Sequence, residues 1–180
     1  MTTIKRPAWA QKTPSMQAYY DSEWGIACHD DRMLFELLTL ESFQIGLSWQ
    51  IVLNKRRALR ARFADFNPAI VAQMTADDVT RLLNDATIIR NRRKIEATIH
   101  NAQVIRALRQ GGQTFDDYVW QLVDYQVQRV QLGENEKLPP KTKTSEAAAK
   151  RFKQDGFQLV GPVTLYSFMQ AAGLVNARLS

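Results

Sequence analysis

Cysteine and histidine are scarce in this 180-residue sequence, which contains one Cys and two His. The single Cys28 excludes an internal disulfide framework and fits the reducing environment of the cytoplasm. The sequence offers few ligands for a zinc site built from Cys and His, because His29 and His100 are the only histidines. We therefore expect a cytoplasmic protein without a bound metal.

Long apolar runs and familiar catalytic motifs are absent too. No run of about 18 apolar residues occurs, so no membrane span is expected. The first seven residues lack the apolar segment of a signal peptide. There is no Walker loop, no recognisable Ser/His/Asp set, and no lysine in an apolar setting that suggests a Schiff-base nucleophile. These absences argue against membrane, Walker-type and nucleophile-dependent functions.

What the sequence does have is clustered positive charge. Lys and Arg outnumber Asp and Glu by 24 to 18, which gives a formal net charge of +6. Dense basic runs occupy residues 55–62 and 90–94, with a shorter one at 141–143. Such runs are either solvated helix faces or sites that bind a polyanion such as nucleic acid. On charge alone, both readings stay open.

Helical signals cover most of the chain, and no stretch gives a convincing alternation of strand-forming residues. Cap residues or Pro signals start helices near residues 14, 31, 48, 68, 76, 91, 115, 145 and 162. Residues 126–144 are polar and predict a long surface loop. We expect an all-α protein with a single domain over residues 1–180.

The most informative segment is residues 34–49. Leu34, Leu37, Leu38 and Glu41 follow the spacing i, i+3, i+4, i+7, so a helix places all four on one face. Burying a carboxylate without a partner costs several kcal/mol, so an acid on an apolar face needs a cation, hydrogen-bond donors or a proton. Glu41 is therefore the best candidate in the chain for a functional acid.

Aromatic residues are concentrated in the first 50 positions. Each of them alone is explained most simply as part of the core. Together with an inward carboxylate, they suit a flat, electron-poor or cationic ligand, such as an alkylated base turned out of DNA. The residues concerned are Trp9, Tyr19, Tyr20, Trp24 and Trp49.

A helix–hairpin–helix is predicted at about residues 79–105. Its short connection could be an ordinary corner between two helices. Alternatively, it could point backbone N–H groups and a helix N-terminus at a phosphate, with the neighbouring basic run adding charge.

Four segments, read in order, carry a resemblance that covers about residues 9–178. They are residues 19–25 (YYDSEWG), 40–49 (LESFQIGLSW), 88–95 (IIRNRRKI) and 166–176 (YSFMQAAGLVN). Together they resemble the DNA-3-methyladenine glycosylase I family. The resemblance implies a helix–hairpin–helix DNA glycosylase fold, with two helical lobes around a base-binding cleft. It also implies a monomer without a cofactor that hydrolyses the N-glycosidic bond of 3-methyladenine in duplex DNA and leaves an abasic site.

The resemblance also implies roles for individual residues. Glu41 would hydrogen-bond the exocyclic amine and a ring nitrogen of the extruded base, and no residue clearly replaces the catalytic aspartate of related glycosylases. Tyr19 and Trp49 would line or stack on the base, while Trp9 and Trp24 would shape the pocket. Our hypothesis is that Glu41 selects the base and stabilises an oxocarbenium-like transition state.

Contacts to the DNA are implied for two further segments. Gln44 and Leu47 would lie near the gap that the extruded base leaves in the duplex. The hairpin would hold phosphates, through residues Thr87, Ile89, Arg90, Arg92 and Lys94.

The sequence departs from the family at its zinc site. The family binds zinc with two Cys and two His, whereas the aligned positions are Pro7, Tyr20 and Arg178, and the sequence ends before the fourth. We expect no structural zinc, and we expect Trp9 and Tyr20 to hold the chain ends by packing against the last helix.

Two more departures affect the pocket and the hairpin. Met16 stands where the family has a pocket tyrosine, and Thr87 stands where it has the hairpin glycine, so Thr87 must tolerate the loop conformation or alter it. One alternative to an enzyme is a protein that binds lesions or duplex DNA without cleaving, and another is a helical module of unrelated small-molecule function, favoured only if the basic runs scatter around the surface. The first of these is the main competitor. The combination of Glu41, Tyr19 and Trp49 argues against it, because a pure binder needs no base pocket.

Overall fold

The computed structural model describes residues 4–132 and 136–179, and its architecture is almost entirely helical. The α-helices are α1 (Pro14–Ser22), α2 (Asp31–Gln44), α3 (Trp49–Arg62), α4 (Pro68–Val71), α5 (Ala76–Leu83), α6 (Arg92–Gln110), α7 (Phe115–Trp120), α8 (Lys143–Gln154) and α9 (Pro162–Ala171). Three 3-10 helices are η1 (Ala8–Gln11), η2 (Ala64–Phe66) and η3 (Gln121–Val123). The prediction of an all-α protein is confirmed.

One short pair of strands was not expected. β1 (Gln128–Arg129) pairs in parallel with β2 (Val175–Asn176). β1 lies inside the region predicted as a polar loop, and β2 lies beyond it. Two residues are too few to produce a recognisable alternation, and their partner lies far along the chain. Residues 133–135 of that predicted loop lie outside the described residues, as do residues 1–3 and 180 of the predicted domain.

Side-chain caps start the helices where the sequence predicts. Thr13 Oγ1 accepts a hydrogen bond from the backbone N–H of Met16, and Asp30 Oδ1 accepts one from Met33. These caps satisfy backbone donors that the first turn of a helix leaves free. α2 ends before Gly46, whose φ of +78° falls in the left-handed region that glycine adopts without strain.

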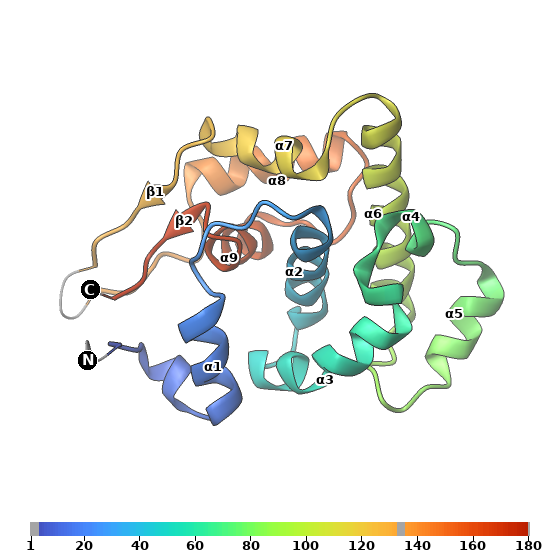
Figure 1. Ribbon diagram of the computed structural model, residues 1–180, viewed down its shortest axis with the longest axis horizontal. Coiled ribbons are helices and arrows are strands. Elements are labelled where there is room, and N and C mark those ends of the chain that lie inside the picture. Colours follow the sequence, from blue (N-terminus) through green and yellow to red (C-terminus); the bar gives the residue numbers. More distant parts are fainter. Residues whose placement is uncertain (1–3, 133–135, 180) are drawn as a thin grey trace.

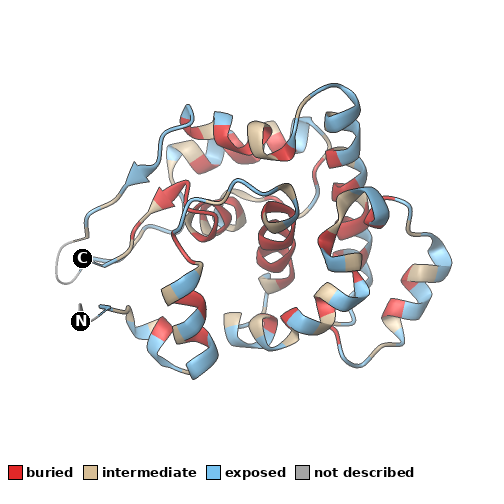
Figure 2. Cartoon of the chain, viewed as in Figure 1, coloured by how far each residue is buried: buried red, intermediate tan, exposed pale blue. Residues whose placement is uncertain are grey.

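Helix α2 lies in the middle of the molecule, between two groups of helices (Figure 1). One group contains α1 and α7–α9, which come from the two ends of the chain, and the other contains α3–α6. Ten consecutive residues of α2, Leu34 to Phe43, are buried, so the helix is enclosed on all sides (Figure 2). A helix enclosed in this way brings every side chain, including its acids, into the interior.

The C-terminal segment is tied to α1 by Arg178 and Leu179. The Arg178 guanidinium donates hydrogen bonds to the backbone carbonyls of Tyr20 and Trp24 and lies 4.7 Å from the centroid of the Tyr20 ring. The Leu179 N–H donates to the Tyr20 hydroxyl at 3.0 Å. The contacts therefore come from residues beyond α9, which corrects the expectation that the last helix supplies them.

The positions that the resemblance assigns to the zinc site carry Pro7, Tyr20 and Arg178, none of which is a usual zinc ligand. The Arg178 guanidinium lies against Tyr20, and the resemblance assigns zinc ligands to both positions. The positive charge of Arg178 would repel a metal cation there. Within residues 4–132 and 136–179, no group of three or more His, Cys, Asp or Glu side chains is arranged so that it could hold a metal ion. None of the helices in the same residues is long and apolar enough to cross a membrane.

Candidate base-binding site

A cavity of about 430 Å³ lies where η1 and α1 meet the C-terminal end of α2, the start of α3 and one face of α9. Its walls combine aromatic rings with a few polar side chains. The lining residues are Trp9, Lys12, Met16, Tyr19, Trp24, Glu41, Gln44, Ser48, Trp49, Gln50, Ser167 and Gln170. The structure thus brings together Glu41, Gln44 and the residues predicted to bind the base or shape its pocket, which are Trp9, Met16, Tyr19, Trp24 and Trp49. Tyr20, which the sequence analysis grouped with these aromatic residues, is not among the lining residues.

The aromatic wall is built from residues far apart in sequence. Tyr19 of α1 and Trp49 at the start of α3 have ring centroids 5.2 Å apart, with their planes tilted by 46°. The Trp9 ring contacts Trp24 edge-on at 5.6 Å and lies 6.4 Å from Tyr19. Met16, one helical turn before Tyr19, lines the wall as a flexible apolar side chain. A planar ligand would meet ring faces here.

Glu41 has an unusual electrostatic environment. It is only 7% exposed, and within the described part of the chain no hydrogen bond or ion pair holds its carboxyl group. Burial raises the pKa of Glu41 to about 8, because the apolar surroundings disfavour the charged form. A ligand that offers N–H donors or positive charge would stabilise the carboxylate and lower this pKa. Glu41 is thus poised to bind such a ligand.

Two more polar atoms of the pocket are buried without a partner. The Tyr19 hydroxyl and the Trp49 indole N–H make no hydrogen bond to any described residue. A buried polar group left in this state costs about 1–3 kcal/mol. Burial raises the pKa of Tyr19 well above its usual value, and the neighbouring Glu41 adds to this shift. Two unpaired hydrogen-bond groups beside an unpaired acid indicate a site that a polar ligand completes.

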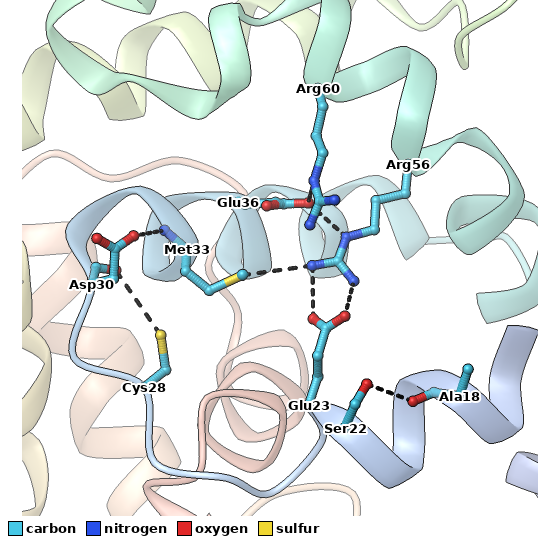
Figure 3. Close-up of polar contacts among 9 residues, drawn as sticks. All are labelled: Ala18, Ser22, Glu23, Cys28, Asp30, Met33, Glu36, Arg56 and Arg60. Atoms are coloured by element: carbon cyan, nitrogen blue, oxygen red, sulfur yellow. Dashed lines mark hydrogen bonds and ion pairs between the residues drawn. The ribbon is translucent and has the colours of Figure 1, made fainter.

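Near Tyr19 lies a set of paired charges that we call the Arg56 cluster, formed by the buried Glu36 and Arg56 and the partly exposed Glu23 and Arg60 (Figure 3). Arg56 donates to Glu36 at 2.6 Å and, through its two terminal nitrogens, to both Glu23 oxygens at 2.9 and 2.8 Å. Arg60 reaches the same Glu36 oxygen at 2.6 Å.

The Arg56 cluster was missed in the sequence, where Arg56 counted only as one charge in the run 55–62. In the structure it joins three helices, because Glu23 follows α1, Glu36 belongs to α2 and Arg56 belongs to α3. Its guanidinium carbon lies 5.9 Å from the centroid of the Tyr19 ring. The sequence did contain a signal for this cluster, because Arg56, Glu23 and Glu36 lie near apolar positions and could therefore pair with one another in a core.

The predicted helix–hairpin–helix consists of α5, a connection over residues 84–91 and α6. Thr87, Arg90 and Arg92 are exposed, and Ile89 is partly buried. Thr87 has no positive φ, so it fits the loop where the family has glycine. Its N–H and hydroxyl both donate to Asp85, which is also paired with Arg62, and these contacts hold the pKa of Asp85 down at about 2.

Lys94 does not occupy the position predicted for it. It is only 8% exposed, and its ammonium donates to the backbone carbonyls of Phe43 at 2.7 Å and Ile45 at 2.6 Å. Its side chain therefore caps the end of α2, where a cation also complements the helix dipole, and it does not face a phosphate. Burial lowers the pKa of Lys94. The Lys94 side chain thus lies in the interior, whereas the sequence analysis placed it at the DNA surface, and its contact with DNA stays a prediction.

The turn between α2 and α3 carries the residues predicted to lie near the gap in the duplex. Gln44 lines the pocket, and Leu47, whose N–H donates to the Gln44 carbonyl at 2.7 Å, is partly buried. Ile45, between them, was not predicted, yet it is 45% exposed. An apolar residue immediately before a glycine at a helix end was the available signal.

Comparison with known proteins agrees with this geometry. Residues 9–180 match the family model described as methyladenine glycosylase. The DNA-3-methyladenine glycosylase 1 of Escherichia coli is 45% identical over 173 residues, which cover 96% of this chain and 92% of the relative. The DNA-3-methyladenine glycosylase of Haemophilus influenzae is 37% identical over 180 residues, covering 100% and 96%.

Solved structures give the same result. A crystal structure of 3-methyladenine DNA glycosylase I superposes with a TM-score of 0.94 at 46% identity, covering 98% of this chain and 97% of the other. The Staphylococcus aureus enzyme, in a structure described as the basis of 3-methyladenine recognition, gives 0.91 at 38%, covering 96% and 92%. With its aromatic pocket around an unpaired acid, the chain belongs to the methyladenine glycosylase family.

Proposed function

We propose that this protein excises 3-methyladenine from alkylated DNA by hydrolysing the N-glycosidic bond, with Glu41 as the residue that binds the base. The observation that carries the proposal is the unpaired, buried Glu41 carboxyl group in a pocket whose Tyr19 hydroxyl and Trp49 N–H also lack partners. The relatives are named for this reaction, and the pocket has the chemistry that it requires.

The pocket fits the base in three respects. Aromatic faces of Tyr19 and Trp49 can stack on a purine, and they attract the positive charge that methylation at N3 gives the nucleotide. The Glu41 carboxylate accepts N–H groups of the base. Because the cationic base favours the charged form of Glu41, binding converts a protonated acid into a carboxylate.

The reaction needs little acid catalysis. When the bond between the sugar C1′ and the base nitrogen breaks, its electron pair stays with the base and neutralises the base's positive charge. Positive charge develops on the sugar, and water adds to C1′ and gives up a proton, leaving an abasic site. The Glu41 carboxylate is fixed beside the separating charges, so it can stabilise the transition state without reorganisation.

The proposal also covers the state of the substrate and the enzyme. Tyr19 and Glu41 in the pocket are buried, so a base must leave the duplex stack to reach them, and the turn with Gln44, Ile45 and Leu47 would then occupy the resulting gap. We also propose that the protein acts as a monomer. A cytoplasmic location, supported by the single cysteine, completes the proposal.

The test is release of free 3-methyladenine from methylated duplex DNA by the purified protein. We expect Glu41→Gln to lower the rate by about 10²–10³-fold, the loss typical of removing one preorganised electrostatic contact. Glu146→Gln on α8 is the matched control, since it makes the same substitution at an exposed position and should leave the rate unchanged. Binding of methylated DNA without release of the base would instead identify a non-cleaving lesion binder.

A further inference from the structure

A second cavity, of about 590 Å³, lies on the other side of the end of α2, and we call it the second cavity. It is bounded by the first turn of α6, the last turn of α8 and the segment that leads into α9. Glu41, Gln44 and Ser167 line both the second cavity and the base pocket. The two cavities therefore adjoin at the end of α2.

The second cavity is positively charged. Arg93 of α6 and Lys153 of α8 line it, and both side chains are exposed. Neither forms an ion pair or hydrogen bond with another described residue, unlike Arg56 and Arg60 in the Arg56 cluster. Glu41 is the only acid among the lining residues. Two uncompensated cations from different helices, on one concave surface, favour an anionic ligand.

The N-terminal end of α9 adds donors to the same surface. Gly161 precedes α9 and provides no side-chain cap, so the first N–H groups of this ten-residue helix are not satisfied by one. A Cβ added at Gly161 would meet nothing within 4 Å, so the approach to these groups is open. Uncapped N–H groups at a helix N-terminus bind phosphate readily.

The segment before α9 is held rigidly. Asn101, buried in α6, accepts a hydrogen bond from the Gln158 N–H at 2.8 Å and donates to the Gln158 carbonyl at 3.1 Å. The next residue, Leu159, has a φ of +55°, which is strained for a branched side chain, and its carbonyl accepts a hydrogen bond from Ser42. Backbone strain that neighbours hold in place is typical of ligand-binding segments.

We infer that the second cavity binds phosphates of the DNA strand that carries the extruded base, beside the flipped nucleotide. The inference rests on the proposed function. A base that enters the pocket at Glu41 brings its own sugar and the adjoining phosphates to the rim where the two cavities meet. The cations and free N–H groups lie directly beyond that rim. This site shares Arg93 with the helix–hairpin–helix but extends beyond it, because Lys153 and the start of α9 come from the C-terminal part of the chain.

The first test measures binding to a duplex that contains a tetrahydrofuran abasic analogue. Arg93→Gln with Lys153→Gln should weaken binding and flatten its salt dependence. Because each phosphate contact contributes about 0.9 to the slope of log K against log salt, the wild type should lose roughly tenfold more affinity than this variant between roughly 50 and 200 mM salt. An unchanged affinity and slope would overturn the inference.

The matched control is Arg32→Gln with Arg106→Gln. Both residues are exposed, have no ion pair among the described residues, and lie toward the far ends of α2 and α6 from the second cavity. The control removes the same total charge, so the weakening should be clearly smaller. Equal losses in the two double variants would show that only the overall charge matters, and would overturn the site.

The second test assigns the strand. A neutral methylphosphonate next to the abasic analogue should weaken wild-type binding when it is on the lesion strand, and should have little further effect in the Arg93→Gln, Lys153→Gln variant. Coupling only to the complementary strand would overturn the assignment.

Binding of free 3-methyladenine separates this inference from the proposed function. The Arg93→Gln, Lys153→Gln variant should bind the free base as the wild type does, followed by tryptophan fluorescence, because its base pocket is intact. If the wild type neither binds the base nor releases it from DNA, the proposed function fails, whereas a loss confined to DNA binding in the variant supports the second cavity.

Discussion

Helix α2 buries two glutamates that have opposite environments. Glu36 is 5% exposed and Glu41 is 7% exposed, and they are separated by five positions on one helix. Glu36 accepts hydrogen bonds from two arginines at 2.6 Å. Glu41 has no partner among the described residues, and burial raises its pKa to about 8. Two acids with similar burial thus differ in whether the protein itself neutralises them.

The same contrast holds for the helices around them. α2 and α3 each contribute residues to both the Arg56 cluster and the base pocket, and α1 contributes Tyr19 to the pocket while Glu23 follows its last turn. In the cluster every charge is paired, whereas in the pocket the Tyr19 hydroxyl and Trp49 N–H are not. The paired set fixes the three helices, and the unpaired set is left for a ligand. Burial alone does not distinguish the two acids, and the presence or absence of a partner does.

The largest effect is expected from a substitution that breaks the ion pairs of the Arg56 cluster. Arg56→Met leaves Glu23 without its ion pair and Glu36 with only Arg60, so we expect a loss of about 3–5 kcal/mol in the free energy of unfolding. Unfolding in urea at neutral pH measures it. The folded fraction should also bind 3-methyladenine more weakly, because α1 and α3 lose their link. A loss below about 1 kcal/mol would mean that the cluster is not what holds these helices.

The next effect comes from titrating the unpaired acid. The folded pKa of Glu41 is about 8 and its ordinary value is 4.5, so between these pH values the folded protein binds a proton that the unfolded chain has lost. Its contribution to stability is therefore full at acid pH and declines as pH rises toward about 8, by up to about 1.4 kcal/mol per pH unit. Urea unfolding of the wild type and Glu41→Gln across this range measures the difference.

Glu41→Gln removes the titrating group, so the stability of the variant should gain on that of the wild type as pH rises. A constant difference from about pH 5 to about pH 8 would contradict the raised pKa. Addition of 3-methyladenine should reduce the pH dependence of the wild type, because the bound base stabilises the carboxylate.

The sequence predicted one of these two acids and missed the other for a physical reason. Helical spacing places Glu41 with Leu34, Leu37 and Leu38, but it describes only one face of a helix. In the structure neighbours enclose α2 on every side, so Glu36 on another face is buried as well. How many faces of a helix are covered depends on the other helices, and the local pattern does not contain that information.

The basic runs illustrate the same limit. Caps and helix starts depend on residues within one turn, so Thr13 and Asp30 could be recognised. Lys94 instead binds carbonyls 51 and 49 positions away, and Arg56 binds Glu36 20 positions away. A run of charges in the sequence does not reveal which member turns inward. The residues of the site could be predicted mainly because several sequence motifs, taken together, resemble one family.

A smaller effect is expected from removing one unpaired group of the pocket. Tyr19→Phe deletes a buried hydroxyl that has no partner in the free protein, so the variant should be as stable as the wild type or slightly more stable. If the base uses this hydroxyl, affinity for 3-methyladenine should fall by about 0.5–1.5 kcal/mol, the net value of one neutral hydrogen bond. Thermal unfolding and fluorescence titration measure the two quantities.

Tyr118→Phe is the matched control for that variant. The Tyr118 hydroxyl is paired with Asp155 at 2.7 Å, away from the pocket lining. Its removal should therefore lower stability and leave affinity for the base unchanged, which is the opposite pattern. Reduced stability in both variants would show that the Tyr19 hydroxyl has a partner in solution.

The smallest effect should come from Arg60, which binds the same Glu36 oxygen as Arg56 at the same 2.6 Å. Its side chain is 41% exposed, whereas that of Arg56 is 8% exposed, so solvent screens its interaction with Glu36. We expect Arg60→Met to cost less than about 1 kcal/mol in urea unfolding, because Glu36 keeps Arg56 as a buried partner. A loss equal to that of Arg56→Met would mean that Glu36 needs both cations. In that case, the presence or absence of a partner would not be enough to describe the two acids of α2. The number of cations that contact each acid would also determine how firmly it is held.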